Sequence, residues 1–210
     1  MRIVILISGR GSNLQAILAA QLPAEIVAVI SNQANATGQK IARTAGIATT
    51  VLAHTDFASR AEFDVTMMQL IDDYMPDLVV LAGYMRILTD EFVHHYRDRL
   101  LNIHPSLLPS YAGLNTHQRA LNDGVKVHGC TAHFVTPTLD HGPIIAQAVV
   151  PVHADDTASS LAERVLQMEH RIYPTAIRWW LAGRISINTD GIVRLSEDLG
   201  FEQTVFYTGD

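Results

Sequence analysis

Apolar runs alternate with segments of helical spacing through the first half of this chain, and this alternation most constrains its fold. The continuous apolar runs are Ile3–Ile7, Ile26–Ile30, Ala48–Leu52 and Leu78–Leu81. Such runs are typical of strands that are buried on both faces. Between them, apolar residues recur at three- and four-residue steps, most clearly from Phe63 to Tyr74. The alternation predicts an α/β fold with a mostly parallel, Rossmann-like twisted sheet and helices on both of its faces.

The pattern changes after Lys126, where two extended segments frame a loop. Val127–Val135 and Ile144–Val152 predict a long hairpin or a pair of strands, which makes the C-terminal portion antiparallel. A helix is expected next, and its signals are a cap at Asp155-Asp156-Thr157, a kink or restart at Pro174 and an end at Gly183. Residues 186–210 show a short alternation around a turn at Asp190-Gly191, followed by a tail that is expected to fray.

Composition excludes several classes of protein. The 210 residues carry a net charge of −6 without a block of like charge, which argues against a nucleic-acid partner. The single cysteine, Cys130, cannot close an internal disulfide or build a thiolate metal cage. The run Ile3–Ile7 is too short for a signal-peptide core, and no stretch approaches the roughly 20 apolar residues of a membrane span. We therefore expect a single domain over residues 1–210, soluble and cytoplasmic, with no metal and no membrane partner.

A glycine-containing loop, Ser8–Asn13, lies between the first predicted strand and the first predicted helix. Glycines allow a tight turn there, and the N-terminus of the following helix suits a phosphate. The loop is not a dinucleotide fingerprint, because Leu14 stands where the third glycine would be, and it lacks the Gly-Lys-Ser/Thr of a P-loop. Phosphate binding is the favoured function, and a turn capped by Ser12 or Asn13 is the structural alternative.

A second candidate site is the end of the run Leu100–Ile103. Asn102 and His104 are two residues apart, so in a strand they project to the same side. An amide donor beside an imidazole suits stabilisation of a developing oxyanion, and the imidazole can also move a proton. Asp140 would orient and charge this imidazole if the fold brought the two together, although an Asp in this context more often forms a turn.

The remaining histidines give weaker signals. His94-His95 is expected on a solvated helix face, and His128 and His133 are expected to face opposite sides of a strand. For His117 the sequence leaves a helix-start residue and a pocket residue open. Cys130 has no evident activating partner.

Five strings occur in an order that resembles a known family. They are SGRGSNLQAI, PDLVVLAGYMRIL, LLNIHPSLLPSYAGLNTH, HGCTAHFV and LDHGPIIAQ. Together they resemble the phosphoribosylglycinamide formyltransferase family of folate-dependent formyltransferases. NIHPSLLP and LDxGP are shared by all folate-dependent formyltransferases, and the SGxGSN loop narrows the resemblance to the branch whose substrate carries a 5′-phosphate. The resemblance is nearly collinear up to about Pro174 and weakest over the last residues.

The resemblance implies a reaction of de novo purine biosynthesis that leads towards IMP. The amine of glycinamide ribonucleotide attacks the formyl carbon of 10-formyltetrahydrofolate, a tetrahedral intermediate forms, and tetrahydrofolate leaves. It also implies a formyltransferase fold with a nucleotide- and phosphate-binding half at about 1–100, a folate and catalytic half at about 101–185 and a C-terminal tail at 186–210. The family's partners are small molecules, and the chain would be a monomer or a homodimer.

Site residues are carried over from the family position by position. The catalytic set is Asn102, His104 and Asp140, in which Asn102 also contacts the folate. The glycinamide ribonucleotide would be bound by Gly11, Ser12 and Asn13 at its phosphate and by Glu169 at its sugar. Folate would be bound by Arg60 at its glutamate carboxylate and by the segment Met85, Arg86, Ile87 and Leu88.

Two positions depart from the family pattern, and two other functions remain as alternatives. His141 replaces the first of two usual glycines after Asp140, and Cys130 replaces a small hydroxyl residue. Another folate-dependent amine formyltransferase or a formyltetrahydrofolate hydrolase would share the catalytic set. The phosphate loop argues against these alternatives, and so does the additional domain of such relatives, for which this chain has no room. A non-catalytic phosphate-binding module would leave Asn102, His104 and Asp140 unexplained.

Overall fold

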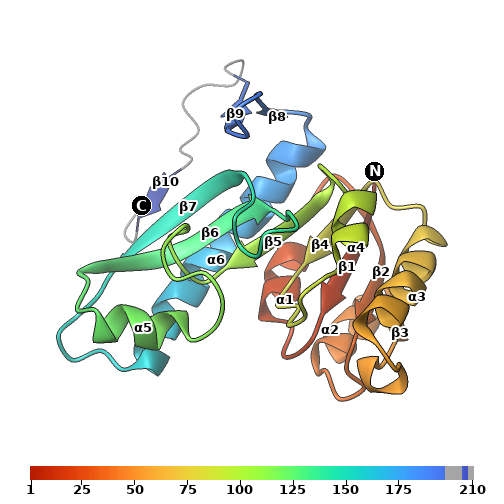
Figure 1. The fold of residues 1–210 in the computed structure, drawn as a ribbon, viewed down its shortest axis with the longest axis horizontal. Helices are drawn as coiled ribbons and strands as arrows, with labels where there is room; N and C mark the ends of the chain where they lie inside the picture. Colours follow the sequence, from red (N-terminus) through yellow and green to blue (C-terminus); the bar gives the residue numbers. More distant parts are fainter. Residues whose placement is uncertain (197–204, 208–210) are drawn as a thin grey trace. The chain divides into compact units, whose positions relative to one another are not determined.

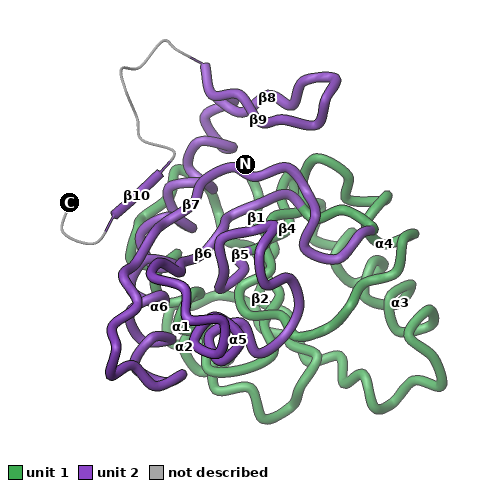
Figure 2. Tube along the Cα trace, turned by 60° about the vertical axis from the view of Figure 1, so that its left-hand side comes forward, with its two compact units in different colours: residues 1–102, 135–137 green, residues 103–134, 138–210 purple. Residues whose placement is uncertain are grey.

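A computed structural model describes residues 1–196 and 205–207 of the chain. The chain forms two compact units (Figures 1 and 2). Unit 1 comprises residues 1–102 and 135–137, and unit 2 comprises residues 103–134 and 138–210.

The sheet of unit 1 is entirely parallel. Its strands are β1 (Arg2–Ile7), β2 (Glu25–Ser31), β3 (Ala48–Val51), β4 (Leu78–Leu81) and the first three residues of β5 (Leu100–His104). They are ordered β5-β4-β1-β2-β3, and β1 pairs with β4 on one side and β2 on the other. The strands predicted from the apolar runs are confirmed within a residue or two, as expected for sequences whose local pattern and burial agree.

The helices of unit 1 follow the strands. They are α1 (Ser12–Ala19), α2 (Gly38–Thr44), the short 3₁₀ helix η1 (His54–Asp56), α3 (Arg60–Asp72) and α4 (Asp90–His95). Ser59 caps α3 by accepting the Glu62 amide N–H, and Thr89 caps α4 by accepting that of Phe92. Both contacts satisfy N–H groups that the first turn of a helix leaves without an intrahelical partner.

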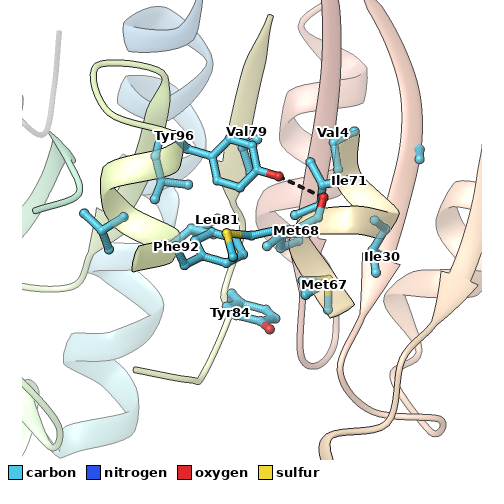
Figure 3. Packing of buried hydrophobic residues seen from close by; sticks show 14 of the residues in the cluster. Val4, Ile30, Met67, Met68, Ile71, Val79, Leu81, Tyr84, Phe92 and Tyr96 are labelled. Atoms are coloured by element: carbon cyan, nitrogen blue, oxygen red, sulfur yellow. Dashed lines mark hydrogen bonds between the residues drawn. The ribbon is translucent and has the colours of Figure 1, made fainter. Parts of the chain in front are cut away.

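Helices cover both faces of this sheet. On one face, Val4, Ile30, Val79 and Leu81 pack with side chains of α3 and α4, including Met67 and Phe92 (Figure 3). On the other face, the Ile7 side chain lies so close to α2 that a Cβ on Gly38 would be 2.8 Å from its Cδ1. Successive residues of β1 point to opposite faces, so the fully buried run Ile3–Ile7 supplies both cores.

Unit 2 is built on an antiparallel pair of strands. β6 (Val127–Phe134) and β7 (Ile144–Pro151) pair antiparallel, and β10 (Val205–Tyr207) adds in parallel to β7. The helices are α5 (Thr116–Asn122) and α6 (Ala158–Leu181), and α6 packs on β6 and β7 (Figure 1). A separate two-stranded antiparallel sheet joins β8 (Ile185–Ile187) to β9 (Val193–Leu195). The antiparallel C-terminal portion is thereby confirmed.

Of the two alternatives expected at Pro174, a kink or a restart of the last helix, the restart is wrong. α6 begins after Thr157, whose side chain takes part in a capping box, and continues through Pro174 to Leu181. Proline removes one backbone donor, but the residues around it, including Ile172, Tyr173 and Ile177, are buried. Burial of a long apolar face supplies most of the stability of a helix in a protein, and it outweighs the missing hydrogen bond. Gly183 follows the helix with φ of 66°, as the expected C-terminal glycine.

The C-terminal tail is described only in part. The turn at Asp190-Gly191 joins β8 and β9 as expected, whereas β10 had no clear sequence signal. The expected fraying falls mainly on residues 197–204 and 208–210, which lie outside the described residues. None of the helices in the described ranges has the length and apolar character needed to cross a lipid bilayer.

Gly129→Ala is expected to destabilise the protein by about 3 kcal/mol or more, because core overpacking against backbone cannot relax cheaply. A Cβ at Gly129 of β6 would overlap the Ala148 carbonyl oxygen of β7 and lie 2.8 Å from Leu107 Cδ2. Gly9→Ala is the control, since a Cβ there has no neighbour within 4 Å. Thermal unfolding of both variants measures the effect, and equal melting temperatures would contradict it.

Candidate active site

The loop Ser8–Asn13 follows β1 and leads into α1, as predicted. Gly11 is the N-cap of α1 with φ of 80°, in the left-handed region that favours glycine, and no side chain caps the helix. A Cβ on Gly11 would lie 2.6 Å from Gly38 Cα, and the Gly38 amide donates to the Gly9 carbonyl at 3.0 Å. The loop is thus held against the start of α2, and only glycine fits at its tightest point.

The segment Met85–Leu88 follows β4 and has no regular secondary structure. Met85 and Ile87 are 70% and 56% exposed, which is unusual for large apolar side chains. Within the described part of the chain, the backbone groups of Arg86, Ile87 and Leu88 make no hydrogen bond to protein. The segment therefore offers both apolar surface and backbone donors and acceptors to a ligand.

Two arginines of unit 1, Arg86 within this segment and Arg60 on α3, lie near Asp64. The Arg86 guanidinium is 4.7 Å from the centroid of the Phe63 ring on α3, a cation–π distance. Arg60 is the exposed first residue of α3. Both arginines act electrostatically on the buried carboxylate of Asp64, which is one turn after Arg60.

His104 and Asp140 are brought together in unit 2. His104 Nδ1 lies 3.4 Å from Asp140 Oδ2, and only 8% of each side chain is exposed. On the other side of the ring, Nε2 lies 3.0 Å from the Tyr111 carbonyl oxygen. A carbonyl and a carboxylate only accept hydrogen bonds, so each ring nitrogen of His104 faces an acceptor. The predicted pairing of Asp140 with His104 is present in the structure.

The two loops that carry these contacts, one after β5 and one between β6 and β7, each contain a residue in the left-handed region. Tyr111 and Asp140 have φ of 57° and 55°, and the Gly113 amide donates to Asp140 Oδ2 at 2.8 Å. A left-handed non-glycine residue costs about 1–2 kcal/mol. Such strain is typical of functional sites, where the surrounding structure holds the backbone in place.

Asn102 lies on β5, two residues before His104, as predicted. It belongs to unit 1, where it is in register with Leu81 of β4, and it is half-buried. Glu169 is buried on α6 in unit 2. His141 is exposed, and its Nδ1–H donates to the Leu139 carbonyl at 2.7 Å, which braces the loop beside Asp140.

Sequence reasoning missed the residues that hold the loop after His104. Thr131 Oγ1 on β6 donates to the Ser106 carbonyl at 2.7 Å and accepts the Leu108 amide at 3.0 Å. Gln147 on β7 is the cross-strand neighbour of Thr131 and donates to both the Leu108 carbonyl and Thr131 Oγ1. No local sequence signal pointed to them, because their contacts join two strands to a loop that is distant in the chain.

Other histidines surround Tyr111 and His104. The His128 ring packs edge-on against the rings of Tyr111 and His117, with centroids 5.7 and 5.3 Å apart. Burial lowers the pKa of His128 to about 4, with a further lowering from the charge of His117, and burial also lowers the pKa of His117. Burial likewise lowers the pKa of His133 to about 4. These histidines are therefore neutral near pH 7 and add no positive charge beside His104. The question that the sequence left open for His117 is answered: it is both the second residue of α5 and part of this cluster.

His94, His95 and Cys130 are the remaining positions that the sequence singled out, and their contacts are those of structural residues. His94 and His95 lie on α4, and His95 Nε2 contacts Asp72 Oδ2 at 2.8 Å. Cys130 is buried, and burial raises the pKa of its thiol well above the ordinary value, so it is no nucleophile. In the described ranges, no three histidine, cysteine or acidic side chains are grouped so that they could hold a metal ion.

Comparison with known proteins gives one consistent result. Residues 1–177 match the family model for formyl transferase. The chain is 52% identical over 192 residues to phosphoribosylglycinamide formyltransferase of Escherichia coli strain K12, covering 90% of this chain and 91% of that protein. Trifunctional purine biosynthetic proteins of animals also match, and the chain spans about a fifth of their length.

Solved structures agree with this match. Glycinamide ribonucleotide transformylase 1 of Symbiobacterium toebii superposes with a TM-score of 0.90 at 46% identity, covering 93% of each chain. A formyltetrahydrofolate deformylase of Pseudomonas syringae is more distant, with a TM-score of 0.85 at 28% identity, and this chain covers 65% of it.

Acidification is expected to destabilise the protein between about pH 6.5 and pH 4. A histidine whose pKa is lower in the folded chain is protonated first in the unfolded chain, so its contribution is complete above 6.5 and falls with pH. The slope is at most about 1.4 kcal/mol per pH unit for each such histidine. Denaturant unfolding at several pH values measures it. His133→Gln, which keeps a donor but does not titrate, should flatten the slope, and an unchanged slope would contradict the assignment.

Proposed function

Because the chain belongs to the formyl transferase family, we propose that it transfers a formyl group from 10-formyltetrahydrofolate to the amine of glycinamide ribonucleotide. The substrate assignment follows from the names of the relatives at high identity and from the glycine loop that suits a 5′-phosphate. The observation that carries the reaction is the buried pair of His104 and Asp140, which places an imidazole between two acceptors.

The proposed chemistry is a direct acyl transfer. The substrate amine forms a bond to the formyl carbon, and the carbonyl oxygen becomes an oxyanion. The former amine nitrogen then loses a proton, and the carbonyl re-forms as the bond to the folate nitrogen breaks and that nitrogen takes a proton. His104 stabilises the oxyanion as a charged donor and supplies a proton, and Asn102 donates to the same oxygen. Asp140 compensates the charge on His104 and relays protons. No covalent enzyme intermediate is needed, in keeping with the buried, protonated state of Cys130.

His104 has a resting partner that substrate must replace. Its Nε2–H donates to the Tyr111 carbonyl at 3.0 Å, so a substrate oxygen receives this proton only when that bond is exchanged. In this exchange, the neutral carbonyl oxygen of Tyr111 is replaced by the more negative substrate oxygen. The hydrogen bond to the charged oxygen is the stronger of the two. His104 therefore gains interaction energy as the oxyanion develops.

The proposed ligand contacts divide between the two units. In unit 1, Gly11, Ser12 and Asn13 bind the phosphate at the start of α1. Folate contacts Arg60 through its carboxylates and Met85–Leu88 through the pterin, and the exposed apolar side chains and available backbone groups of that segment support this assignment. In unit 2, Glu169 binds the sugar. We also propose a phosphate-binding half at about 1–100, a folate and catalytic half at about 101–185, and a tail at 186–210. These halves match the proposed ligand contacts only approximately, because the folate-contacting residues lie in the first half.

The wider context is part of the same proposal. The chain acts in the cytoplasm in purine biosynthesis towards IMP, uses only small-molecule substrates and needs no metal or nucleic acid, as a monomer or homodimer. An alternative, hydrolysis of the formyl donor or formylation of another amine, is distinguished by a folate absorbance assay. The proposal expects folate release that depends on glycinamide ribonucleotide. Release without the amine would indicate hydrolysis, and no release with it would overturn the proposal.

His104→Ala is expected to lower kcat by about 10²–10³-fold while the KM for glycinamide ribonucleotide changes little, because an oxyanion donor acts mainly in the transition state. His94→Ala, which removes an exposed histidine from α4, is the control and should keep wild-type kinetics. Steady-state kinetics measures both. Near-normal kcat with a raised KM in His104→Ala would remove this residue from the catalytic set.

Asp140→Asn is expected to lower kcat by about 10²-fold or more without unfolding the protein. The amide oxygen can still accept the Gly113 N–H, but it carries no charge to compensate a protonated His104. Asp155→Asn, at an exposed carboxylate before α6, is the matched control. Kinetics together with melting temperature checks the outcome: retained activity, or a loss explained by a fall in melting temperature, would contradict the electrostatic role.

A further inference from the structure

Both ends of the segment Met85–Leu88 are held by side chains that are distant in sequence. At the start, the Met85 amide donates to Ser8 Oγ at 2.8 Å. Immediately after the end, the Thr89 amide donates to Asp64 Oδ2 at 2.7 Å. Between these two contacts, the backbone of Arg86, Ile87 and Leu88 makes no hydrogen bond among the described residues. Hydrogen bonds to the backbone of this segment are therefore confined to its two ends among the described residues, and its other contacts are made by side chains, including Arg86 on the Phe63 ring and Leu88 against the core of unit 1.

The Ser8 hydroxyl has a fixed orientation. It is buried, and it donates its one proton to Asn32 Oδ1 at 2.6 Å, which leaves its lone pairs for the Met85 amide. The Ser8 amide also donates to the Gly83 carbonyl at 3.2 Å. Ser8 is at the same time the first residue of the glycine loop, so one side chain joins that loop to the segment after β4.

Asp64 is fully buried on α3, which is unusual for a carboxylate. Its Oδ2 accepts the Thr89 amide, whereas its Oδ1 has no hydrogen-bond partner among the described residues. Burial raises the pKa of Asp64, and the Thr89 contact, Arg86 and Arg60 oppose this rise. A buried carboxylate with an unsatisfied oxygen costs stability, and the contact that it makes is at the end of the segment.

We propose that Ser8 and Asp64 are positioning residues that fix Met85–Leu88 in the form that binds the formyl donor. The inference rests on the proposed function, in which this segment contacts folate. A ligand recognised by backbone groups needs them held within about 0.5 Å of their binding positions, and unrestrained backbone would have to be ordered on binding. Ser8 and Asp64 supply that order before the ligand arrives.

The kinetic test separates the two substrates. Ser8→Ala and Asp64→Ala are each expected to raise the KM for 10-formyltetrahydrofolate by about three- to tenfold, the effect of one net hydrogen bond. The KM for glycinamide ribonucleotide is expected to stay within about twofold, because the Gly9–Gly38 contact that holds the phosphate loop remains. Ser31→Ala is the control, since among the described residues this buried hydroxyl bonds only to the backbone of Gln33.

A second pair of variants separates positioning from general stability. Asp64→Asn keeps an oxygen for the Thr89 amide and is expected to restore a donor KM near that of wild type, unlike Asp64→Ala. Tyr84→Phe removes a neighbouring buried hydroxyl that has no hydrogen-bond partner among the described residues, and it should leave the donor KM unchanged. Amide hydrogen exchange should become faster at Met85 in Ser8→Ala and at Thr89 in Asp64→Ala.

Each outcome is decisive. Donor KM values that stay unchanged in Ser8→Ala and Asp64→Ala, or that rise equally for both substrates, would overturn the inference while leaving the proposed function intact. A rise in Asp64→Asn as large as in Asp64→Ala would overturn the role of the Thr89 contact. A wild-type protein that forms no formylated product from glycinamide ribonucleotide would overturn the proposed function, and the inference with it.

Discussion

Burial of β1 on both faces, with a strand paired on either side, is the constraint on which unit 1 depends. Its run Ile3–Ile7 is inaccessible to solvent, so no polar group can be placed along the strand itself. Parallel neighbours end at the same edge of the sheet, and polar groups collect where those strands end. Ser8 follows β1, Asn32 follows β2 and Met85 comes shortly after β4, and the three are joined by two hydrogen bonds through the Ser8 hydroxyl. The contact between the glycine loop and the segment after β4 is thus a consequence of the strand order β4-β1-β2.

In unit 2, burial lowers the pKa values of three histidines near His104. His117 on α5, and His128 and His133 on β6, all lie within electrostatic range of His104. Burial lowers the pKa of these three, whereas His104 alone faces a carboxylate at Nδ1 and a carbonyl at Nε2. Several positive charges in so small a region would repel one another. Because His117, His128 and His133 are neutral, Asp140 faces a single imidazole, that of His104.

Local patterns predicted the elements of the fold, and the failures have physical causes. Apolar runs located β1 to β4, and full burial accompanies the pattern in β4 and nearly all of β1, whereas β3 is only partly buried. A restart at Pro174 is absent because packing around Ile172 and Ile177 outweighs a local rule. β10 is three residues long, too short for a periodic signal.

The candidate site was only partly predictable, because some of its contacts join residues that are distant in the sequence. Residue type and spacing led to the glycine loop, Asn102 and His104, because strand and loop are adjacent in sequence. The pairing of His104 with Asp140 spans 36 positions, and it was expected only from a family resemblance. The Tyr111 carbonyl, Thr131 and Gln147 were missed, because backbone acceptors carry no sequence signal and the two side chains matter through contacts with a distant loop.

The contacts that hold the loop after β5 explain how the buried imidazole of His104 can stabilise a charge that exists only during the reaction. Thr131 and Gln147 hold the backbone between Ser106 and Leu108, and Asp140 accepts from the Gly113 amide on the far side of Tyr111. His104 consequently has its donors directed before any substrate is bound, with the Tyr111 carbonyl as the acceptor at Nε2. In the proposed reaction an oxyanion takes over that role, so the ring needs no new orientation and only one hydrogen bond changes partner. With this preorganisation, the free-energy cost of orienting the groups is incurred when the protein folds, in left-handed residues such as Tyr111 and Asp140. That cost is not added to the barrier to formyl transfer.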